Sequence, residues 1–281
     1  MTNTVLFLLL AVSSLCVVIY ILYNYFTNPS QRKGTLFTCS TFFDFKTGDR
    51  WDRFCTAIDS LKDHHSKETL AKIDKWIVIN EYSDNSTVDW CKKVKERYPF
   101  ITCIQKGFTE KGQARTMNII LQKIRPYKLW IHWEEAWSSR TGFLDDAFEI
   151  MNSDDGRNIT QLQFTFHKGT VNWLDVESER IHCKGRVCTI DPSDKTDEFI
   201  GQSPYRLRDG THAAWPLYSL LPSINRAEFY SGLGEFDEDP DLWPIKFEWD
   251  FARRWYKAGG KKAVLQDGPV WRPGTHISTY Q

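Results

Sequence analysis

Apolar and polar residues follow strand and helix periods through the first half of this chain. Residues 35–45 are rich in β-forming side chains and predict a strand, and residues 75–80 and 101–104 predict two more. Apolar residues recur at helical spacing within residues 51–61 and 88–98. Because strand and helix alternate, the pattern predicts right-handed crossovers and a mostly parallel sheet with helices on both faces.

The most informative stretch runs from residue 111 to residue 137. It predicts a glycine-containing turn, an amphipathic helix that ends before Pro126, and a short buried strand at residues 127–133. That strand delivers Glu134 and Glu135 to its carboxyl end, the edge at which open α/β sheets bind ligands. Two adjacent carboxylates repel each other, so the pair predicts a bound Mg²⁺ or Mn²⁺. A solvated acidic loop is the alternative.

After residue 152 the pattern changes to short strand-like runs. Residues 162–167, 170–176 and 179–190 are separated by Gly, Asn and Asp, which predicts antiparallel hairpins. Residues 246–258 predict a closing helix, and residues 262–265 predict a last strand. Nothing in this half demands a second independent core, so we expect one large α/β domain.

Charge, motifs and cysteines narrow the class of protein. The 281 residues carry no net charge, which argues against a nucleic-acid binder held by phosphate attraction. Neither GxGxxG nor a P-loop is present, so a dinucleotide oxidoreductase or a P-loop NTPase is disfavoured. Cys183 and Cys188 bracket a short turn and can pair across a hairpin if they are oxidised. Buried thiols are expected at four other cysteines: Cys39, Cys55, Cys91 and Cys103.

Acidic residues follow two strands of the predicted parallel sheet, an arrangement that can bind a nucleotide diphosphate. Glu81 and Asp84 follow the strand at residues 75–80 and can accept hydrogen bonds from a base or a ribose. Glu134 and Glu135 can hold a cation on the diphosphate, where a divalent ion stabilises a departing anion.

A third acidic cluster lies at residues 235–239 and continues at Glu248 and Asp250. Glu248 opens a predicted helix between two aromatic residues, a setting that can raise the pKa of a carboxyl group toward that of a useful base. The alternative is that these acids only stabilise the first turn of the helix.

Residues 35–278 resemble a GT-A glycosyltransferase of the family 2 type, most like the membrane-associated enzymes of large DNA viruses. Several segments match in order. They are residues 78–87, the nucleotide-binding turn; residues 111–121, with Arg115 and Asn118 at the donor site; residues 130–137, in the place of the acidic metal motif; residues 235–239 with 247–255, which carry the catalytic base; and residues 270–278, where Arg272 or His276 stands near the diphosphate.

The resemblance implies a GT-A, Rossmann-like domain that transfers a sugar, with inversion, from a UDP- or GDP-sugar to a hydroxyl of a glycan, protein or lipid. The implied roles are Glu248 and Asp250 for catalysis; Glu81, Asp84, Arg115, Asn118 and Glu134 for the donor; Glu134, Glu135 and His276 for Mn²⁺ or Mg²⁺; and Trp215, Asp237 and Trp249 for the acceptor. Ala136 departs from the pattern, because a third acid is common there. Alternatives are a retaining or metal-independent transferase, a nucleotidyltransferase, and an inactive membrane protein that binds nucleotide sugars or carbohydrate.

Residues 5–26 form a nearly unbroken apolar run, and about 20 such residues span a bilayer as a helix. No Lys or Arg precedes the run and no clear cleavage pattern follows it, so we expect a retained anchor and not a signal peptide. The predicted organisation is an anchor at residues 1–27, a linker at 28–34 and the transferase domain at 35–281. Within the domain, residues 35–150 form the nucleotide-sugar half and residues 151–281 the acceptor half.

The orientation of the anchor follows from charges beside it. Arg32 and Lys33 flank the apolar run, so the positive-inside rule places the domain in the cytosol. Glycosylation sequons at Asn85 and Asn158 point to a lumen instead. The cytosolic orientation is the prediction.

Overall fold

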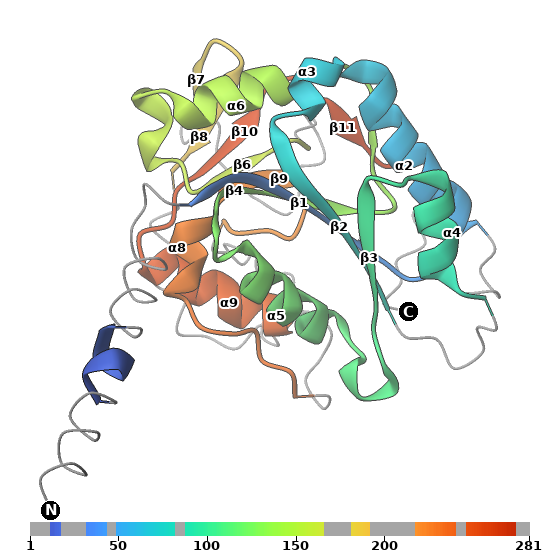
Figure 1. The fold of residues 1–281 in the computed structure, drawn as a ribbon. Coiled ribbons are helices and arrows are strands. Elements are labelled where there is room, and N and C mark those ends of the chain that lie inside the picture. Colours follow the sequence, from blue (N-terminus) through green and yellow to red (C-terminus); the bar gives the residue numbers. More distant parts are fainter. Residues whose placement is uncertain are drawn as a thin grey trace, which may run out of the picture.

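A computed structural model describes residues 12–17, 32–43, 49–81, 88–165, 181–191, 217–239 and 246–273. Nine strands of these residues form one sheet (Figure 1). In chain order they are β1 (Lys33–Thr41), β2 (Ile73–Asn80), β3 (Ile101–Gln105), β4 (Tyr127–Glu134), β6 (Gln161–Gln163), β7 (Ile181–Lys184), β8 (Val187–Ile190), β9 (Ser223–Arg226) and β10 (Lys262–Leu265). Their order across the sheet is β3-β2-β1-β4-β9-β6-β10-β8-β7.

The first four strands are parallel, as the alternation of strand and helix predicts. β1 pairs in parallel with β2 and with β4, and β2 pairs in parallel with β3. β1 ends at Thr41, short of the predicted residue 45, because the amide of Phe43 donates to the side chain of Asn80 (2.9 Å) and leaves the ladder. The helix before β4 ends at Ile124, so the proline signal placed this boundary correctly.

Helices cover both faces of the sheet. They are α2 (Arg50–His64), α3 (Lys67–Leu70), α4 (Trp90–Arg97), α5 (Gln113–Ile124), α6 (Leu144–Asn152), α8 (Ala227–Ser231) and α9 (Lys246–Lys257). α2, α4 and α6 bury apolar residues on one face, and α5, α8 and α9 bury theirs on the other (Figure 1). Successive residues of β1 serve the two layers in turn, since Leu36 packs in one cluster and Phe37 in the other.

The second half of the sheet is mixed. β9 runs antiparallel between β4 and β6, and β10 is parallel to β6 and antiparallel to β8. β7 and β8 form the antiparallel hairpin expected within residues 179–190. The predicted run at residues 170–176 lies outside the described residues. A separate two-stranded sheet joins β5 (Ser138–Ser139) to β11 (Val270–Trp271).

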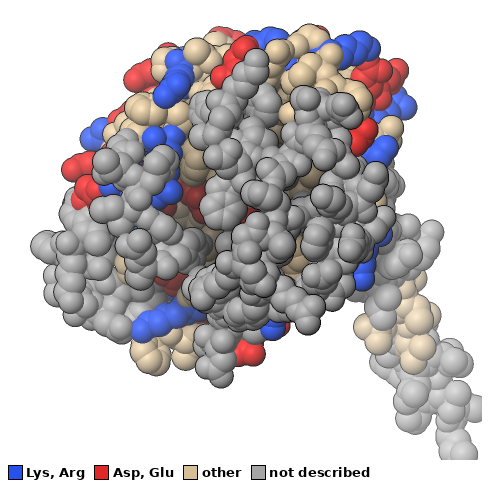
Figure 2. Space-filling view, turned by 180° about the vertical axis from the view of Figure 1, so that it is seen from behind, with Lys and Arg blue, Asp and Glu red and all other residues tan. Residues whose placement is uncertain are grey.

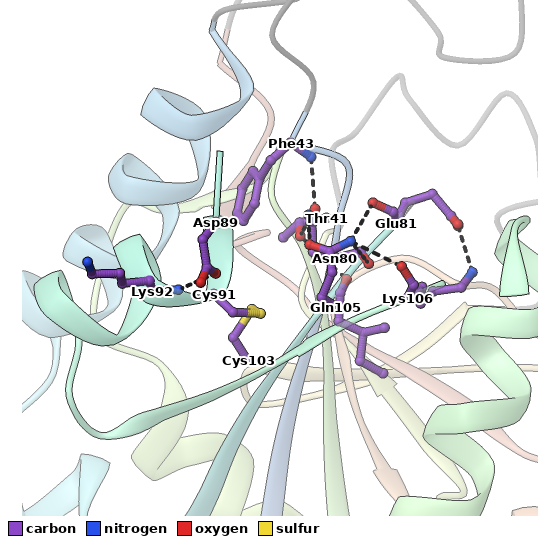
Figure 3. Close-up of a disulfide and its surroundings, with 11 residues drawn as sticks. Thr41, Phe43, Asn80, Glu81, Asp89, Cys91, Lys92, Cys103, Gln105 and Lys106 are labelled. Carbon is purple, nitrogen blue, oxygen red and sulfur yellow. Dashed lines mark hydrogen bonds and ion pairs between the residues drawn. A yellow bond between two sulfur atoms is a disulfide. The ribbon is translucent and has the colours of Figure 1, made fainter. Parts of the chain in front are cut away.

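Two disulfides link described cysteines. Cys183 and Cys188 pair across the β7–β8 hairpin, as the sequence suggested for oxidised cysteines. Cys91 of α4 pairs with Cys103 of β3 (Figure 3), so the expectation of free thiols at these two positions is wrong. The two residues lie 12 apart along the chain, and only the packing of α4 beside β3 brings their sulfurs together. Cys39 and Cys55 are buried thiols, as expected.

The predicted anchor is only partly described. Residues 12–17 are helical and exposed, and the rest of the run at residues 5–26 lies outside the described residues. Within the described part of the chain, no helix is both long and apolar enough to cross a membrane. On the face seen in Figure 2, basic and acidic side chains intermingle over the described surface.

Candidate active site

Polar side chains meet at the carboxyl ends of β1, β2 and β3 (Figure 3). Asn80 ends β2, and its Oδ1 accepts hydrogen bonds from the Thr41 hydroxyl (3.2 Å) and the Phe43 amide (2.9 Å). Its Nδ2 donates to Gln105 of β3 (2.8 Å). This buried amide therefore fixes the ends of three strands relative to one another, directly before the predicted donor residue Glu81.

Lys106 lies beside Glu81, a predicted donor residue, and the sequence analysis did not single it out. Its side chain is fully buried, and its Nζ donates to Glu81 Oε2, to the Gly112 carbonyl and to the Thr116 hydroxyl, each at 2.8 Å. Burial lowers the pKa of Lys106, while the Glu81 carboxylate opposes that shift. Gly112 has φ +101°, a conformation that favours glycine, where its carbonyl accepts from Lys106. A lysine directly after a strand at the ligand edge was the available signal.

Arg115 and Asn118 of α5 lie next to the acidic segment at residues 235–239. Asn118 is buried, donates to the Phe236 carbonyl (2.9 Å) and accepts from the Phe236 amide (2.7 Å). Glu238 accepts from both Asn118 (2.5 Å) and Arg115 (3.3 Å). The structure thus brings two predicted donor residues beside Asp237, the predicted acceptor residue, which is exposed.

Glu134 and Glu135 stand at the end of β4, but their surroundings differ. Glu134 accepts long hydrogen bonds from Gln113 (3.4 Å) and the Trp137 indole (3.3 Å), and it forms no ion pair with another described residue. Glu135 forms an ion pair with Arg50 of α2 (2.8 Å), in which both side chains are mostly buried. Burial, and then the neighbouring Glu135 charge, raise the pKa of Glu134 to about 7. Burial also raises the pKa of Glu135, and Arg50 opposes this.

Arg272 approaches the same turn from the end of the chain. β11 pairs with β5 so that Trp271 lies opposite Ser138, which brings Arg272 beside the turn that follows Glu134. The positive charge of Arg272 lowers the pKa of both Glu134 and Glu135, against the larger effect of burial. That Arg272 or His276 stands near the diphosphate stays a prediction.

Glu248 opens α9 and faces the same region. Its Oε1 accepts a hydrogen bond from the Leu220 amide (3.0 Å). Burial raises the pKa of Glu248 to about 7, against the lowering effects of the Leu220 hydrogen bond and of Lys262. The charge of Glu248 in turn contributes to the raised pKa of Glu134, so the two carboxylates lie within electrostatic range of each other. Residues far apart in the sequence therefore converge.

The remaining predicted residues do not join this group. Asp250 lies two positions after Glu248, which on a helix points the side chain to another side, and it contacts Arg253 (3.7 Å). Trp249 is only 1% exposed and belongs to the core, so it offers no stacking surface for an acceptor. Asp84, Trp215 and His276 lie outside the described residues.

A divalent cation was expected at Glu134, Glu135 and His276. Among the described residues, no group of three or more His, Cys, Asp or Glu side chains is arranged to hold a metal. Mg²⁺ commonly uses one or two carboxylates together with substrate phosphates. Glu134 fits that role, because it is half-buried and lacks an ion pair within the described residues. Glu135 fits less well, because Arg50 already neutralises it.

No protein-family model and no curated protein sequence matches the chain. Several solved structures match the chain at low sequence identity. S. aureus TarS 1–349 is 14% identical, with a TM-score of 0.52, covering 83% of this chain and 58% of that one. GalNAc-T7 with UDP, GalNAc and Mn²⁺ is 13% identical, with a TM-score of 0.55, covering 86% and 44%. The mannosyltransferase PcManGT from Pyrobaculum calidifontis, in complex with GDP-Man and Mn²⁺, is 11% identical, with a TM-score of 0.50, covering 89% and 64%.

These likenesses concern the fold. They confirm the GT-A type of α/β architecture, with a mostly parallel sheet and antiparallel strands in the second half. The chain spans less than two thirds of the length of each of these structures.

Proposed function

We propose that this chain is a glycosyltransferase that moves a sugar from a nucleotide-diphosphate donor to a hydroxyl group of an acceptor. One observation carries the proposal: Glu134 ends β4, and Glu248 binds the Leu220 amide just before β9, whose Ser223 pairs with His132 of β4, so both carboxylates lie at the carboxyl edge of a GT-A sheet. Ligands of open α/β sheets bind at this edge. The assignment to the family 2 type and the viral origin rest on the sequence resemblance alone.

Glu248 is the base in the proposed reaction. The Leu220 amide holds one oxygen of its carboxylate, and a pKa of about 7 suits proton transfer near neutral pH. The acceptor hydroxyl gives its proton to Glu248 while its oxygen bonds to the anomeric carbon. The bond from that carbon to the diphosphate breaks, and the nucleoside diphosphate leaves with the electron pair. Attack from the face opposite the leaving group inverts the anomeric centre.

The donor lies across two groups of residues in this proposal. Glu81, held by Lys106, and Arg115 border the nucleotide, and Glu134 and Arg272 border the diphosphate. A divalent cation held at Glu134, when bound, would stabilise the negative charge of the leaving diphosphate. Arg50 keeps Glu135 in place as a neutralised neighbour.

A donor screen tests the proposal. The full chain is incubated with UDP-, GDP- and CMP-sugars and Mn²⁺, and release of the nucleoside diphosphate or monophosphate is measured. We expect turnover with one donor class. Saturable donor binding without turnover would favour the inactive binding protein, the alternative that Ala136 supports because a third acid is common at its position. Absence of both binding and turnover would overturn the proposal.

Glu134→Ala and Glu135→Ala form a matched pair of variants that differ in their ion pairing. We expect Glu134→Ala to weaken donor binding about 10-fold in Mn²⁺ and much less in EDTA, a loss in the range of about 1–2 kcal/mol. Glu135→Ala should leave the response to Mn²⁺ intact, because its carboxylate is paired with Arg50. Titration of donor affinity against Mn²⁺ concentration checks both. An unchanged metal response in Glu134→Ala would remove Glu134 as the ligand.

The compartment and the membrane anchor also belong to the proposal. Disulfides persist in oxidising compartments, so Cys91–Cys103 and Cys183–Cys188 support the lumenal side over the predicted cytosolic one. Asn158, in a sequon, is exposed at the end of a 3₁₀ turn. Expressed as the full chain in cells that secrete glycoproteins, the protein should lose mass on glycosidase treatment, and Asn158→Gln should remove part of that loss. Unpaired cysteines and no glycan would restore the cytosolic orientation.

A further inference from the structure

The segment at residues 217–220 enters the site in a constrained backbone conformation. Leu217 has φ +66°, and it is the one non-glycine residue with positive φ in the described ranges. Such a conformation is costly for leucine and persists only where the surroundings hold it. Lys262 of β10 supplies one restraint, because its Nζ donates to the Leu217 carbonyl (2.8 Å).

Two further side chains hold the same segment from other elements. The amide of Gln161, on β6, donates to the Ser219 carbonyl (2.8 Å) and accepts from the Ser219 amide (3.2 Å). The Leu220 amide donates to Glu248 of α9 (3.0 Å). Buried or half-buried polar groups from two strands and one helix thus fix the backbone that orients the proposed base.

Lys262 is also a charge in an apolar environment. It is 3% exposed and lies two residues before Val264, on the face of β10 that packs under α9. Burial lowers its pKa to about 7, and the Glu248 carboxylate opposes that shift. Reciprocally, Lys262 lowers the pKa of Glu248. A buried ammonium needs such a partner, because burying a charge without compensation is costly.

We infer that Lys262 is a positioning residue for the proposed reaction: it holds residues 217–220 in the conformation that orients Glu248, and its ammonium group supports the carboxylate form of that base. The inference rests on the proposed function. Two other ionisable groups interact electrostatically with Glu248: Glu134 from β4 and Tyr218 from the segment. On α9 itself, Asp250 and Arg254 interact with each other. Lys262 is the one cation whose charge lowers the pKa of Glu248 among the described residues.

The pH profile of Lys262→Met tests the inference. Glu248 must be deprotonated to act as a base, so kcat/KM of the wild type should rise with pH through about 7. Removing the ammonium should shift this acidic limb upward by about 0.5–1 pH unit, which lowers kcat/KM about 2- to 5-fold at pH 7 and less at higher pH. Lys261→Met is the matched control, since Lys261 is the exposed neighbour and should keep the wild-type profile.

Lys262→Gln distinguishes the hydrogen bond to the Leu217 carbonyl from the effect of the charge, because glutamine can still donate to that carbonyl but carries no charge. A purely structural lysine would give Lys262→Met a uniform loss of rate at all pH values with an unmoved acidic limb, which would overturn the inference. A second readout needs no turnover: infrared titration of the Glu248 carboxyl, identified by its absence in Glu248→Gln. If the wild type shows no transfer, the proposed function fails, yet an unmoved infrared midpoint in Lys262→Gln would still overturn the role of Lys262, and an upward shift would support it.

Discussion

Glu248→Gln is expected to lower kcat of sugar transfer about 10²- to 10⁴-fold, the range associated with loss of a general base. The amide keeps the shape of the side chain and can still accept from the Leu220 amide, so the segment at residues 217–220 should stay in place. Donor Kd should stay within about twofold, because the base acts on the acceptor hydroxyl. Single-turnover transfer and donor titration on the same preparation measure both quantities.

Two companion variants sharpen this result. Glu149→Gln changes an exposed glutamate on α6, far from the site, and should behave as wild type. Asp250→Asn tests the other carboxylate that the resemblance implies, which the structure turns toward Arg253. Normal turnover in Glu248→Gln would exclude Glu248 as the base, and an equally large loss in Asp250→Asn would return Asp250 to the catalytic group.

Lys106→Met is expected to lower the free energy of unfolding by about 3 kcal/mol, the range for removing one partner of a buried ion pair. The change deprives Glu81, the Gly112 carbonyl and Thr116 of their shared donor. Glu81 keeps 19% of its side chain exposed, so water can relieve part of the cost. Urea unfolding followed by fluorescence gives the change from the midpoint at constant slope.

A double-mutant cycle distinguishes the ion pair from simple packing. Adding Glu81→Gln to Lys106→Met removes the charge that was left without its partner, so the double variant should be less destabilised than the sum of the singles. Lys123→Met, at an exposed position of α5, is the control and should change the unfolding free energy by less than about 0.5 kcal/mol. Strict additivity would show that Glu81 and Lys106 do not stabilise each other.

Local signals in the sequence predicted the parallel half of the fold well. Pro126 and the apolar periods set the limits of α5 and β4, and these depend on residues close in the chain. β9 was missed because its residues, 223–226, fall at the end of a proline-punctuated apolar run and pair with strands distant in sequence. Periodicity carries no information about such pairing.

Site residues could be predicted from the sequence where residue type and position along a strand or helix indicate their chemistry. They could not be predicted where their role depends on tertiary contacts. The carboxylates at Glu134 and Glu248 could be selected from their places at a strand end and a helix start. Lys262 could not, because a lysine in a sequence is normally exposed and only tertiary packing buries it. For Lys106 the one signal was its place directly after a strand. Trp249, which the resemblance implied for the acceptor, is instead buried in the core.

The place of β9 between β4 and β6 has a consequence for synthesis on the ribosome. Trp130 of β4 bonds through its carbonyl to Asn225, which follows it by 95 residues. While the intervening chain is being made, one edge of β4 stays without its neighbour, and an apolar strand edge invites pairing with other chains. Fragments that stop before β9 should therefore aggregate, and chaperones that cover nascent strands should matter most during this interval.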